Sequence, residues 1–258
     1  MRAIFMGKHK RSAARALDWL AGEGCEVVAV VAPQPDALTR DEQRLDLVAE
    51  RHGLPLVSDD GLYERPPRGV DMVISFLFWK RIREPLLSLG RIGCLNFHPA
   101  PLPDFRGLGG YNLAILDGLR EWGVSCHFVD ERLDTGDLVE VERFPIEPET
   151  ATAFSLDLES QERLHGMFRR VMGRALAGEP LPREPQAGLA PGRYVSREEL
   201  EWLRRVRTGD DLSRKLRAFW YPPHPGAVIE VEGRELTLVD ELLLADAAIA
   251  YRSAGLIP

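Results

Sequence analysis

The alternation of apolar runs with amphipathic segments constrains the fold of this 258-residue chain most strongly. Strands are predicted at the apolar runs 2–7, 25–33, 54–58, 70–78 and 93–98, and helices at 12–24 and 39–53. Ala13, Leu17 and Leu20 share one face of the first helix, and Thr39 is a candidate N-cap of the second. This alternation indicates an α/β fold with a doubly wound, mostly parallel sheet.

The second half of the chain follows a different pattern. Two strands, 123–129 and 137–144, are predicted on either side of an acidic turn, and a long amphipathic helix is predicted over 151–178. The stretch 179–193 is rich in Pro and Gly and lacks periodicity, so it marks a boundary. A helical stretch around 197–217 and an alternating pair over 226–244, typical of a hairpin, follow. We expect a main domain over 1–180 and a small C-terminal α+β extension over 194–258.

Composition and charge exclude several classes of protein. The formal net charge of −7 argues against general nucleic-acid binding, which relies on Lys and Arg at phosphates. Cys25, Cys94 and Cys126 lie far apart in apolar runs without a CxxC pair, which predicts buried free thiols and no metal site. The N-terminal apolar run is too short for a signal peptide, and no segment has the length of a membrane span. We therefore expect a soluble cytoplasmic protein.

The stretch CLNFHPAPLPDFRG, Cys94 to Gly107, joins a predicted buried strand to a run of prolines. Strand periodicity places Asn96 and His98 on the same face where this strand ends. Pro99 biases His98 toward extended geometry, and the prolines stiffen the chain as it leaves the sheet. Parallel sheets carry their ligand sites at such strand ends. His98 is therefore either a structural hydrogen-bonding group or a catalytic one.

A second polar stretch, VDERLDTGD, carries Asp130, Glu131, Asp134 and Asp137. A solvated turn explains Glu131 and also fits Asp137, and the spacing does not match a calcium loop of the EF type. A base oriented by a carboxylate is a recurring arrangement for proton transfer, and an amide N–H can hold an oxyanion. No serine, cysteine or lysine stands out as a covalent nucleophile. A set of Asn, His and Asp therefore suggests direct attack by an amine or water on a bound carbonyl.

Both stretches resemble motifs of the folate-dependent formyltransferases. NFHPAPLPDFRG is similar to the family's Asn–x–His–Pro signature, followed by Leu-Pro and Arg-Gly. VSCHFVDERLDTGDLV is similar to its second motif, His–x–Val–Asp–Glu followed by Asp–x–Gly. The two motifs have the family's order and separation, and the resemblance covers roughly residues 1–178. It implies a Rossmann-like formyltransferase fold, with the catalytic domain over 1–180.

The resemblance also implies roles for individual residues. Asn96, His98 and Asp134 match the catalytic positions: Asn96 and His98 stabilise the oxyanion, and Asp134, alone or through His98 and water, accepts the amine proton. The formyl donor is 10-formyltetrahydrofolate. The implied folate-binding residues are Phe78, Trp79, Lys80, Arg81, Ile82, His127, Val129 and Asp130, of which His127 is equally a candidate partner of the turn. The residues expected to face the acceptor are Arg106, Gly109, Gly110, Tyr111, Asn112, Trp220 and Tyr221.

The acceptor amine is open among several substrates. Residues 186–258 hold ten Lys plus Arg and eleven Asp plus Glu, a net of −1 (10 − 11), so they do not form an RNA-binding surface. The stretches PAPLPDFRGLGGYN and KLRAFWYPPHPGAVIEVEG resemble the sugar-type enzymes more closely, which favours the amine of a nucleotide-linked amino sugar. The alternative acceptors are methionyl-tRNA, an ornithine-type precursor and glycinamide ribonucleotide.

Two further functions stay open: hydrolysis of formyltetrahydrofolate and folate binding without catalysis. The three intact catalytic positions argue against a binding module. The aromatic cluster of residues 219–221 is either a hydrophobic plug between the tail and the catalytic domain, a stacking surface for a base, or a contact of a homodimer.

Overall fold

The computed structural model describes residues 1–186, 192–245 and 247 of the chain. These residues belong to two compact units. The first comprises the described residues within 1–104, 123–143 and 160–192, and the second comprises those within 105–122, 144–159 and 193–258. Two segments that precede the expected boundary at 180, namely 105–122 and 144–159, therefore group with the C-terminal residues.

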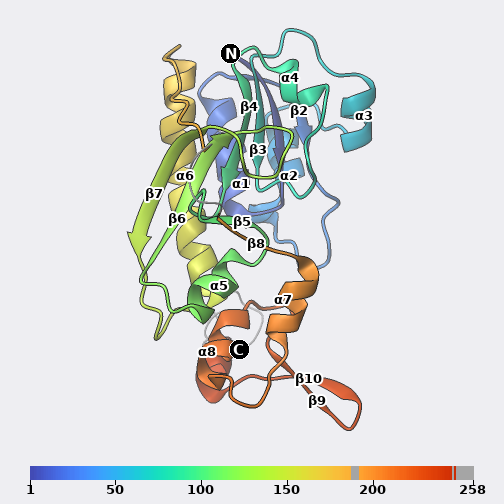
Figure 1. Ribbon diagram of the computed structural model, residues 1–258. Coiled ribbons are helices and arrows are strands. Elements are labelled where there is room, and N and C mark those ends of the chain that lie inside the picture. Colours follow the sequence, from blue (N-terminus) through green and yellow to red (C-terminus); the bar gives the residue numbers. More distant parts are fainter. Residues whose placement is uncertain (187–191, 246, 248–258) are drawn as a thin grey trace. The chain divides into compact units, whose positions relative to one another are not determined.

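A six-stranded sheet in the order β2-β1-β3-β4-β6-β7 forms the centre of the first unit (Figure 1). Its strands are β1 (Arg2–Gly7), β2 (Glu26–Val31), β3 (Met72–Phe76), β4 (Gly93–His98), β6 (Glu121–Phe128) and β7 (Leu138–Pro145). β1 is parallel to both β2 and β3, and β3 is parallel to β4, whereas β6 is antiparallel to β4. The predicted doubly wound, mostly parallel α/β sheet is confirmed.

The helices of this unit connect the strands. They are α1 (Arg11–Gly22), the 3₁₀ helix η1 (Asp41–Gln43), α2 (Leu45–Arg51), α3 (Asp59–Glu64), α4 (Leu86–Leu89) and the greater part of α6 (Ala153–Leu176). Ala13, Leu17 and Leu20 of α1 are fully buried, as their spacing predicted. None of the described helices is long and apolar enough to cross a membrane.

Two predicted elements near the N-terminus differ from the structure. The strand expected at 54–58 is reduced to one bridge, between Leu56 and Val30. The helix expected over 39–53 consists of the separate elements η1 and α2. Thr39 does not cap a helix, because its hydroxyl donates to Oδ1 of Asp36 at 2.7 Å and closes a local turn. Short-range hydrogen bonds of this kind compete with helical ones.

One face of the sheet is covered by an aromatic cluster. Phe76 of β3 and Phe97 of β4 are paired in register, with ring centroids 5.6 Å apart. The ring of Phe168 from α6 packs edge-on against Phe76 at 5.6 Å, and Trp19 of α1 packs edge-on against Phe168 at 6.0 Å. Edge-to-face and offset geometries are the favoured arrangements of aromatic pairs. This cluster therefore fixes α1 and α6 on one face of the strands that carry the candidate site.

The opposite face of the sheet carries the polar residues as well as a second apolar cluster. Ile4, Val73 and Cys94, from three neighbouring strands, pack with Leu62 of α3 and Leu86 of α4. Because side chains alternate along a strand, the residues two positions after Val73 and Cys94 lie on this same face. Those residues are Ser75 and Asn96, at the carboxyl ends of β3 and β4.

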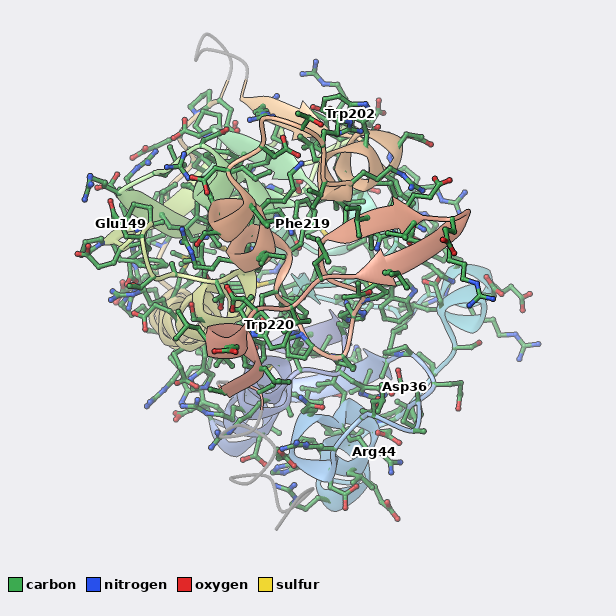
Figure 2. All side chains as sticks on the ribbon, turned by 90° about the horizontal axis from the view of Figure 1, so that it is seen from below. Asp36, Arg44, Glu149, Trp202, Phe219 and Trp220 are labelled. Carbon is green, nitrogen blue, oxygen red and sulfur yellow. The ribbon has the colours of Figure 1, made fainter. Side chains whose placement is uncertain are left out.

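The second unit has its own small core. Its elements are β5 (Phe105–Gly107), α5 (Gly110–Leu116), β8 (Arg193–Val195), α7 (Arg197–Arg204), α8 (Leu212–Phe219), β9 (Val228–Val231) and β10 (Arg234–Thr237). β9 and β10 form the predicted antiparallel hairpin, but residues 241–245 are helical. Phe219 is buried with Ile115 and Leu216, and Trp220 is partly buried against them. Trp202 of α7 is 59% exposed (Figure 2).

Candidate active site

Ser75, Asn96 and His127 form one row across three adjacent strands. The register pairs Ser75 with Asn96 between β3 and β4, and Asn96 with His127 between β4 and β6. Directly paired residues project from the same face of a sheet. Accordingly, the Ser75 hydroxyl donates to Oδ1 of Asn96 at 2.7 Å, and Nδ2 of Asn96 lies 3.1 Å from Nε2 of His127.

The directions of the hydrogen bonds in this row follow from the tautomer of His127, the last residue of the row. Nδ1 of His127 lies 2.7 Å from the carbonyl oxygen of Phe128, which can only accept, so Nδ1 carries the hydrogen. In the neutral ring Nε2 is then an acceptor, and Asn96 must donate to it through Nδ2. The amide nitrogen of Asn96 carries two hydrogens, and His127 takes one. The other is available to an oxygen of a ligand.

His98 ends β4 two residues after Asn96, on the same face, and is 8% exposed. The chain beyond it is held by Ser125, the residue of β6 paired with His98. The buried Ser125 hydroxyl donates to the carbonyl of Ala100 at 2.8 Å and accepts the N–H of Leu102 at 2.9 Å. The exit from the strand is therefore fixed by a buried hydrogen-bonded serine as well as by the prolines.

Asp134 approaches this row from the turn between β6 and β7. Its side chain is 6% exposed, and its Oδ1 lies 3.6 Å from Nε2 of His127 and 3.9 Å from Nδ1 of His98. Both separations are too long for direct hydrogen bonds. The predicted catalytic residues Asn96, His98 and Asp134, together with His127, thus converge at the carboxyl edge of β4.

The turn that carries Asp134 is held from inside the first unit. Asp134 has φ +54°, a left-handed conformation that Asp tolerates better than most side chains. The amide of buried Gln186 donates to the carbonyls of Asp134 at 3.3 Å and Gly136 at 2.7 Å. A Cβ on Gly136 would lie 1.9 Å from the carbonyl oxygen of Phe128, so only glycine fits there. The Asp–x–Gly motif therefore includes its glycine for steric reasons.

The predicted folate-binding residues form two segments, which share a core cluster. Phe78 and Val129 are partly buried against the apolar cluster that contains Ile82. Trp79 is 43% exposed, and its ring lies 4.5 Å from that of Phe78. Leu77, directly after β3, has φ +57°, a strained conformation for a bulky side chain that reorients the chain at the strand end. Arg81 is exposed.

The polar members of these segments have intramolecular partners. Nζ of Lys80 donates to Asp59 at 2.8 Å, which raises the pKa of this exposed lysine. The Asp130 carboxylate accepts the Thr135 hydroxyl at 2.7 Å and the N–H of Arg132 at 2.9 Å. In the structure Asp130 therefore stabilises the turn that carries Asp134. Contact of these residues with folate stays a prediction.

The residues expected to face the acceptor all belong to the second unit. Gly109 has φ +70° and precedes α5, which begins at Gly110 and carries Tyr111. Arg106 lies in β5, which pairs with β8. Nδ2 of Asn112 donates to the carbonyl of Ala218 at 2.7 Å and links α5 to α8.

The two aromatic candidates lie at the end of α8. The Tyr221 hydroxyl donates to Asp157 at 2.6 Å, and burial raises the pKa of this tyrosine. Trp220 packs on the core of the second unit. Asn112 and Tyr221 thus have structural contacts within this unit, and the acceptor role of the set stays a prediction.

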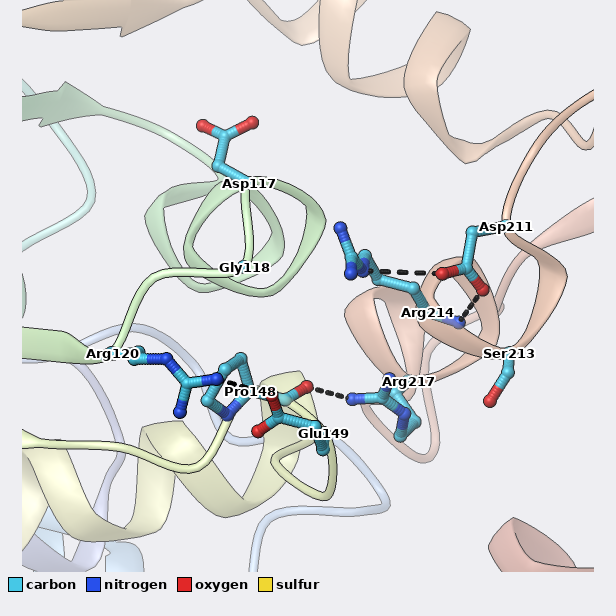
Figure 3. A pocket seen from close by; sticks show the side chains of 9 residues that line it. All are labelled: Asp117, Gly118, Arg120, Pro148, Glu149, Asp211, Ser213, Arg214 and Arg217. Atoms are coloured by element: carbon cyan, nitrogen blue, oxygen red, sulfur yellow. Dashed lines mark hydrogen bonds and ion pairs between the residues drawn. The ribbon is translucent and has the colours of Figure 1, made fainter.

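A polar pocket of about 400 Å³ also lies within the second unit (Figure 3). Three arginines line it, and each has an intramolecular partner. Arg120 donates to Glu149 at 2.8 Å, Arg214 lies 3.5 Å from Asp211, and Arg217 donates to the carbonyl of Ala151 at 3.3 Å. Arg120 and Arg214 are thus paired with acids, whereas Arg217 donates to a carbonyl oxygen.

Three residues that position the site lay outside the sequence-based prediction: Ser75, Ser125 and Gln186. Each is a buried polar residue in or next to an apolar or irregular segment, where a sequence pattern assigns it no partner. Ser75 interrupts the otherwise apolar run MVISFLF, and this is the one signal that the sequence offered. A polar residue in a doubly buried strand requires a hydrogen-bond partner.

Comparison with known proteins agrees with the motifs. Residues 61–172 match the family described as formyl transferase. The chain is 30% identical over 266 residues to the methionyl-tRNA formyltransferase of Sphingopyxis alaskensis, covering 99% of this chain and 85% of the relative. It is 32% identical over 171 residues to the GDP-perosamine N-formyltransferase of Brucella melitensis, covering 64% of this chain and 62% of that relative.

A solved structure matches the fold over most of the chain. The N-formyltransferase of Helicobacter canadensis, crystallised with folinic acid and dTDP-3-aminofucose, superposes with a TM-score of 0.74 at 18% identity, covering 93% of this chain and 89% of that one. At this identity the likeness shows the fold alone. The sequence relatives show the family: the chain belongs to the folate-dependent formyltransferases. The resemblance stated from the two motifs is confirmed.

Proposed function

We propose that this protein transfers a formyl group from 10-formyltetrahydrofolate to the amine of a nucleotide-linked amino sugar. The observation that carries the transfer is the convergence of Asn96, His98 and Asp134 at one edge of the sheet. These residues supply an amide donor, an imidazole and a buried carboxylate. Asp134 lies 3.9 Å from His98, and it is linked to Asn96 through His127, at 3.6 Å and 3.1 Å. This set suits acyl transfer without a covalent enzyme intermediate.

The chemistry follows from the groups present. The acceptor amine attacks the formyl carbon, and the bond from that carbon to the folate nitrogen breaks, so that tetrahydrofolate leaves. The remaining amide hydrogen of Asn96 and an N–H of His98 stabilise the negative charge that develops on the formyl oxygen. Asp134 accepts the proton that the amine loses, directly or through water and His98. The leaving nitrogen takes up a proton, so the transfer is balanced without a further reactant.

The second unit supports a small acceptor rather than tRNA. Several of its basic side chains are engaged with acids, among them Arg193 with Asp117 at 2.7 Å and Lys215 with Asp210 at 2.5 Å. Arg204 of α7 similarly lies 3.0 Å from Glu235. RNA binding depends on cations that neutralise phosphates, and cations already paired with carboxylates contribute little. The charge arrangement therefore favours an acceptor held by a few specific contacts.

The known proteins support both acceptor classes. The Brucella relative acts on GDP-perosamine according to its name, and the Helicobacter structure holds dTDP-3-aminofucose, so two formyltransferases similar to this chain are associated with nucleotide-linked amino sugars. Methionyl-tRNA is the second candidate acceptor, because the Sphingopyxis relative spans 99% of this chain. We place the amino sugar first because of the paired charges of the second unit.

A turnover assay tests the proposal. The protein is mixed with 10-formyltetrahydrofolate and, in separate reactions, a panel of nucleotide-linked amino sugars, methionyl-tRNA, ornithine and glycinamide ribonucleotide. Tetrahydrofolate release is followed by absorbance, and each product is weighed for the gain of one formyl group. Turnover with an amino sugar alone supports the proposal. Turnover with tRNA alone refutes the acceptor, folate release without a formylated product indicates a hydrolase, and folate binding without turnover indicates a binding module.

A further inference from the structure

The oxygen end of the Asn96 amide accepts a hydrogen bond from Ser75, a residue outside the motifs of the site. Ser75 is 4% exposed, and its hydroxyl donates to Oδ1 of Asn96 at 2.7 Å. We propose that Ser75 is a positioning residue for formyl transfer, which holds the Asn96 amide with Nδ2 toward His127 and one amide hydrogen available to the formyl oxygen. This inference rests on the proposed function and adds to it a residue that sets the geometry of the oxyanion donor.

The row across the sheet explains why the Ser75 hydroxyl turns to Asn96. On the other side of Ser75 the register places Met6 of β1, whose thioether is a weak acceptor. Oδ1 of Asn96 is therefore the strong acceptor that the row offers to this hydroxyl. A buried hydroxyl needs such a partner, and an amide oxygen in the same setting needs a donor.

His127 and Ser75 have different parts in fixing the amide. A hydroxyl can donate or accept, so Ser75 alone is compatible with either amide orientation. His127 selects the orientation, because a reversed amide would set Oδ1 against the acceptor Nε2. Ser75 then anchors the oxygen end. Without its hydroxyl, Oδ1 loses this donor, and the terminal torsion of Asn96, which has a broad energy profile, can rotate.

Steady-state kinetics test this role once the acceptor is known. We expect Ser75→Ala to lower kcat by about 10-fold to 100-fold, less than the loss of the Asn96 donor itself, with KM for 10-formyltetrahydrofolate within about twofold. Ser75→Thr keeps the hydroxyl on a residue suited to a strand and should recover most of kcat. Ser160→Ala is the matched control. Ser160 is fully buried, but its hydroxyl has no hydrogen-bond partner within the described residues, so kcat should not change.

A double-mutant cycle separates positioning from general damage. If Ser75 acts through Asn96, then Ser75→Ala should cost nothing further in the Asn96→Ala background. An equal loss of kcat in both backgrounds would overturn the proposal. If Ser75→Ala fails to fold, Ser75→Cys replaces it, since cysteine keeps the volume but is a weak donor, and it should show the same coupling.

The orientation of the amide can also be measured without any acceptor. The chain has two asparagines, Asn96 and Asn112, so selective ¹⁵N-asparagine labelling gives two side-chain amide pairs in the NMR spectrum. Asn96→Ala assigns them. Asn112 donates to Ala218 within the second unit and is an internal reference. We expect Ser75→Ala to shift the Asn96 pair and to speed its hydrogen exchange at least about threefold, leaving the Asn112 pair unchanged, and Ser75→Thr to reverse the effect.

The kinetic and NMR experiments distinguish failure of the Ser75 proposal from failure of the proposed function. An active wild-type protein whose Ser75→Ala variant keeps both kcat and the Asn96 signals refutes the positioning role alone. A wild-type protein that formylates none of the acceptors refutes the proposed function, and the role of Ser75 in transfer with it. In that second case the NMR response still reports whether Ser75 anchors the Asn96 amide.

Discussion

Nδ1 of His98 lies 3.9 Å from Oδ1 of Asp134 in a buried site, a separation that brings an imidazole and a carboxylate together without a direct hydrogen bond. The two residues come from different elements, β4 and the turn after β6. The same carboxylate oxygen lies 3.6 Å from Nε2 of His127. The Asp134 carboxylate therefore faces two imidazoles, those of His98 and His127.

Removing either partner should abolish most of the activity without unfolding the protein. We expect His98→Ala to lower the turnover rate by about 10² to 10⁴, as for other acid–base or oxyanion groups. Asp134→Asn is the better test of the carboxylate, because asparagine also tolerates the left-handed backbone at φ +54°. Turnover and circular dichroism are measured together. Unfolding of His98→Ala would support a structural role for this histidine.

Gly136 should not tolerate a side chain. A Cβ there would lie 1.9 Å from the carbonyl oxygen of Phe128, so Gly136→Ala must displace the turn that carries Asp134, and the turnover rate should fall at least about 10-fold. Gly173→Ala in α6 is the matched control, because its added Cβ meets no atom of the described residues within 4 Å apart from the adjoining helix backbone. That variant should keep full activity and gain up to about 1 kcal/mol in unfolding free energy. Equal activities of the two variants would contradict the steric argument.

Asp71 should make folding depend on pH. Its carboxylate accepts the N–H of Arg2 at 2.9 Å and Nε of Arg91 at 3.0 Å, and the first of these contacts contributes most to lowering the pKa of Asp71. A lowered folded-state pKa gives stability that is present above the unfolded value of about 3.9 and is lost as the pH falls through the folded value.

The variant Asp71→Asn isolates this contribution. Asparagine has one acceptor oxygen, so at pH 7 the unfolding free energy should fall by about 1–2 kcal/mol. Urea unfolding of both proteins at pH 7 and at pH 3 measures the difference. The difference in unfolding free energy should narrow at pH 3, because the Asp71 carboxyl of the unfolded wild-type protein then takes up a proton, which favours unfolding. If the difference in unfolding free energy between the two proteins were the same at both pH values, the charge of Asp71 would not be the stabilising feature.

The three cysteines should report global unfolding. Cys25, Cys94 and Cys126 are free and buried, which agrees with the prediction from their apolar surroundings. Burial raises the pKa of Cys25 to about 11, so roughly 0.1% of it is thiolate at pH 8, and it raises the pKa of the other two thiols as well. An aromatic disulfide reagent at pH 8 should therefore label no thiol in the folded protein and all three in urea. Rapid labelling of a folded-state thiol would reveal local opening.

The strand pattern was predictable because it depends on local periodicity. Short apolar runs form strands when neighbouring elements can bury them. The alternation of side chains along a strand is enough to place Asn96 and His98 on one face. The predictions that failed concern segments in which local hydrogen bonds or pairings compete with the predicted element. The Thr39 hydroxyl donates to Asp36 instead of capping a helix. Leu56 forms a single β-bridge with Val30 instead of belonging to a full strand.

The sequence by itself determined the α/β class, the strand that ends at His98 and, through two motifs, the family. Only the tertiary structure decided which distant residues meet Asn96. Ser75 and His127 are 21 and 31 residues away from it, and they become its neighbours because the register of β3, β4 and β6 aligns them. Gln186, 52 residues beyond Asp134, holds the turn in the same way. Local periodicity says which face a side chain takes, but register and hydrogen-bond partners are set by packing between elements far apart in the chain.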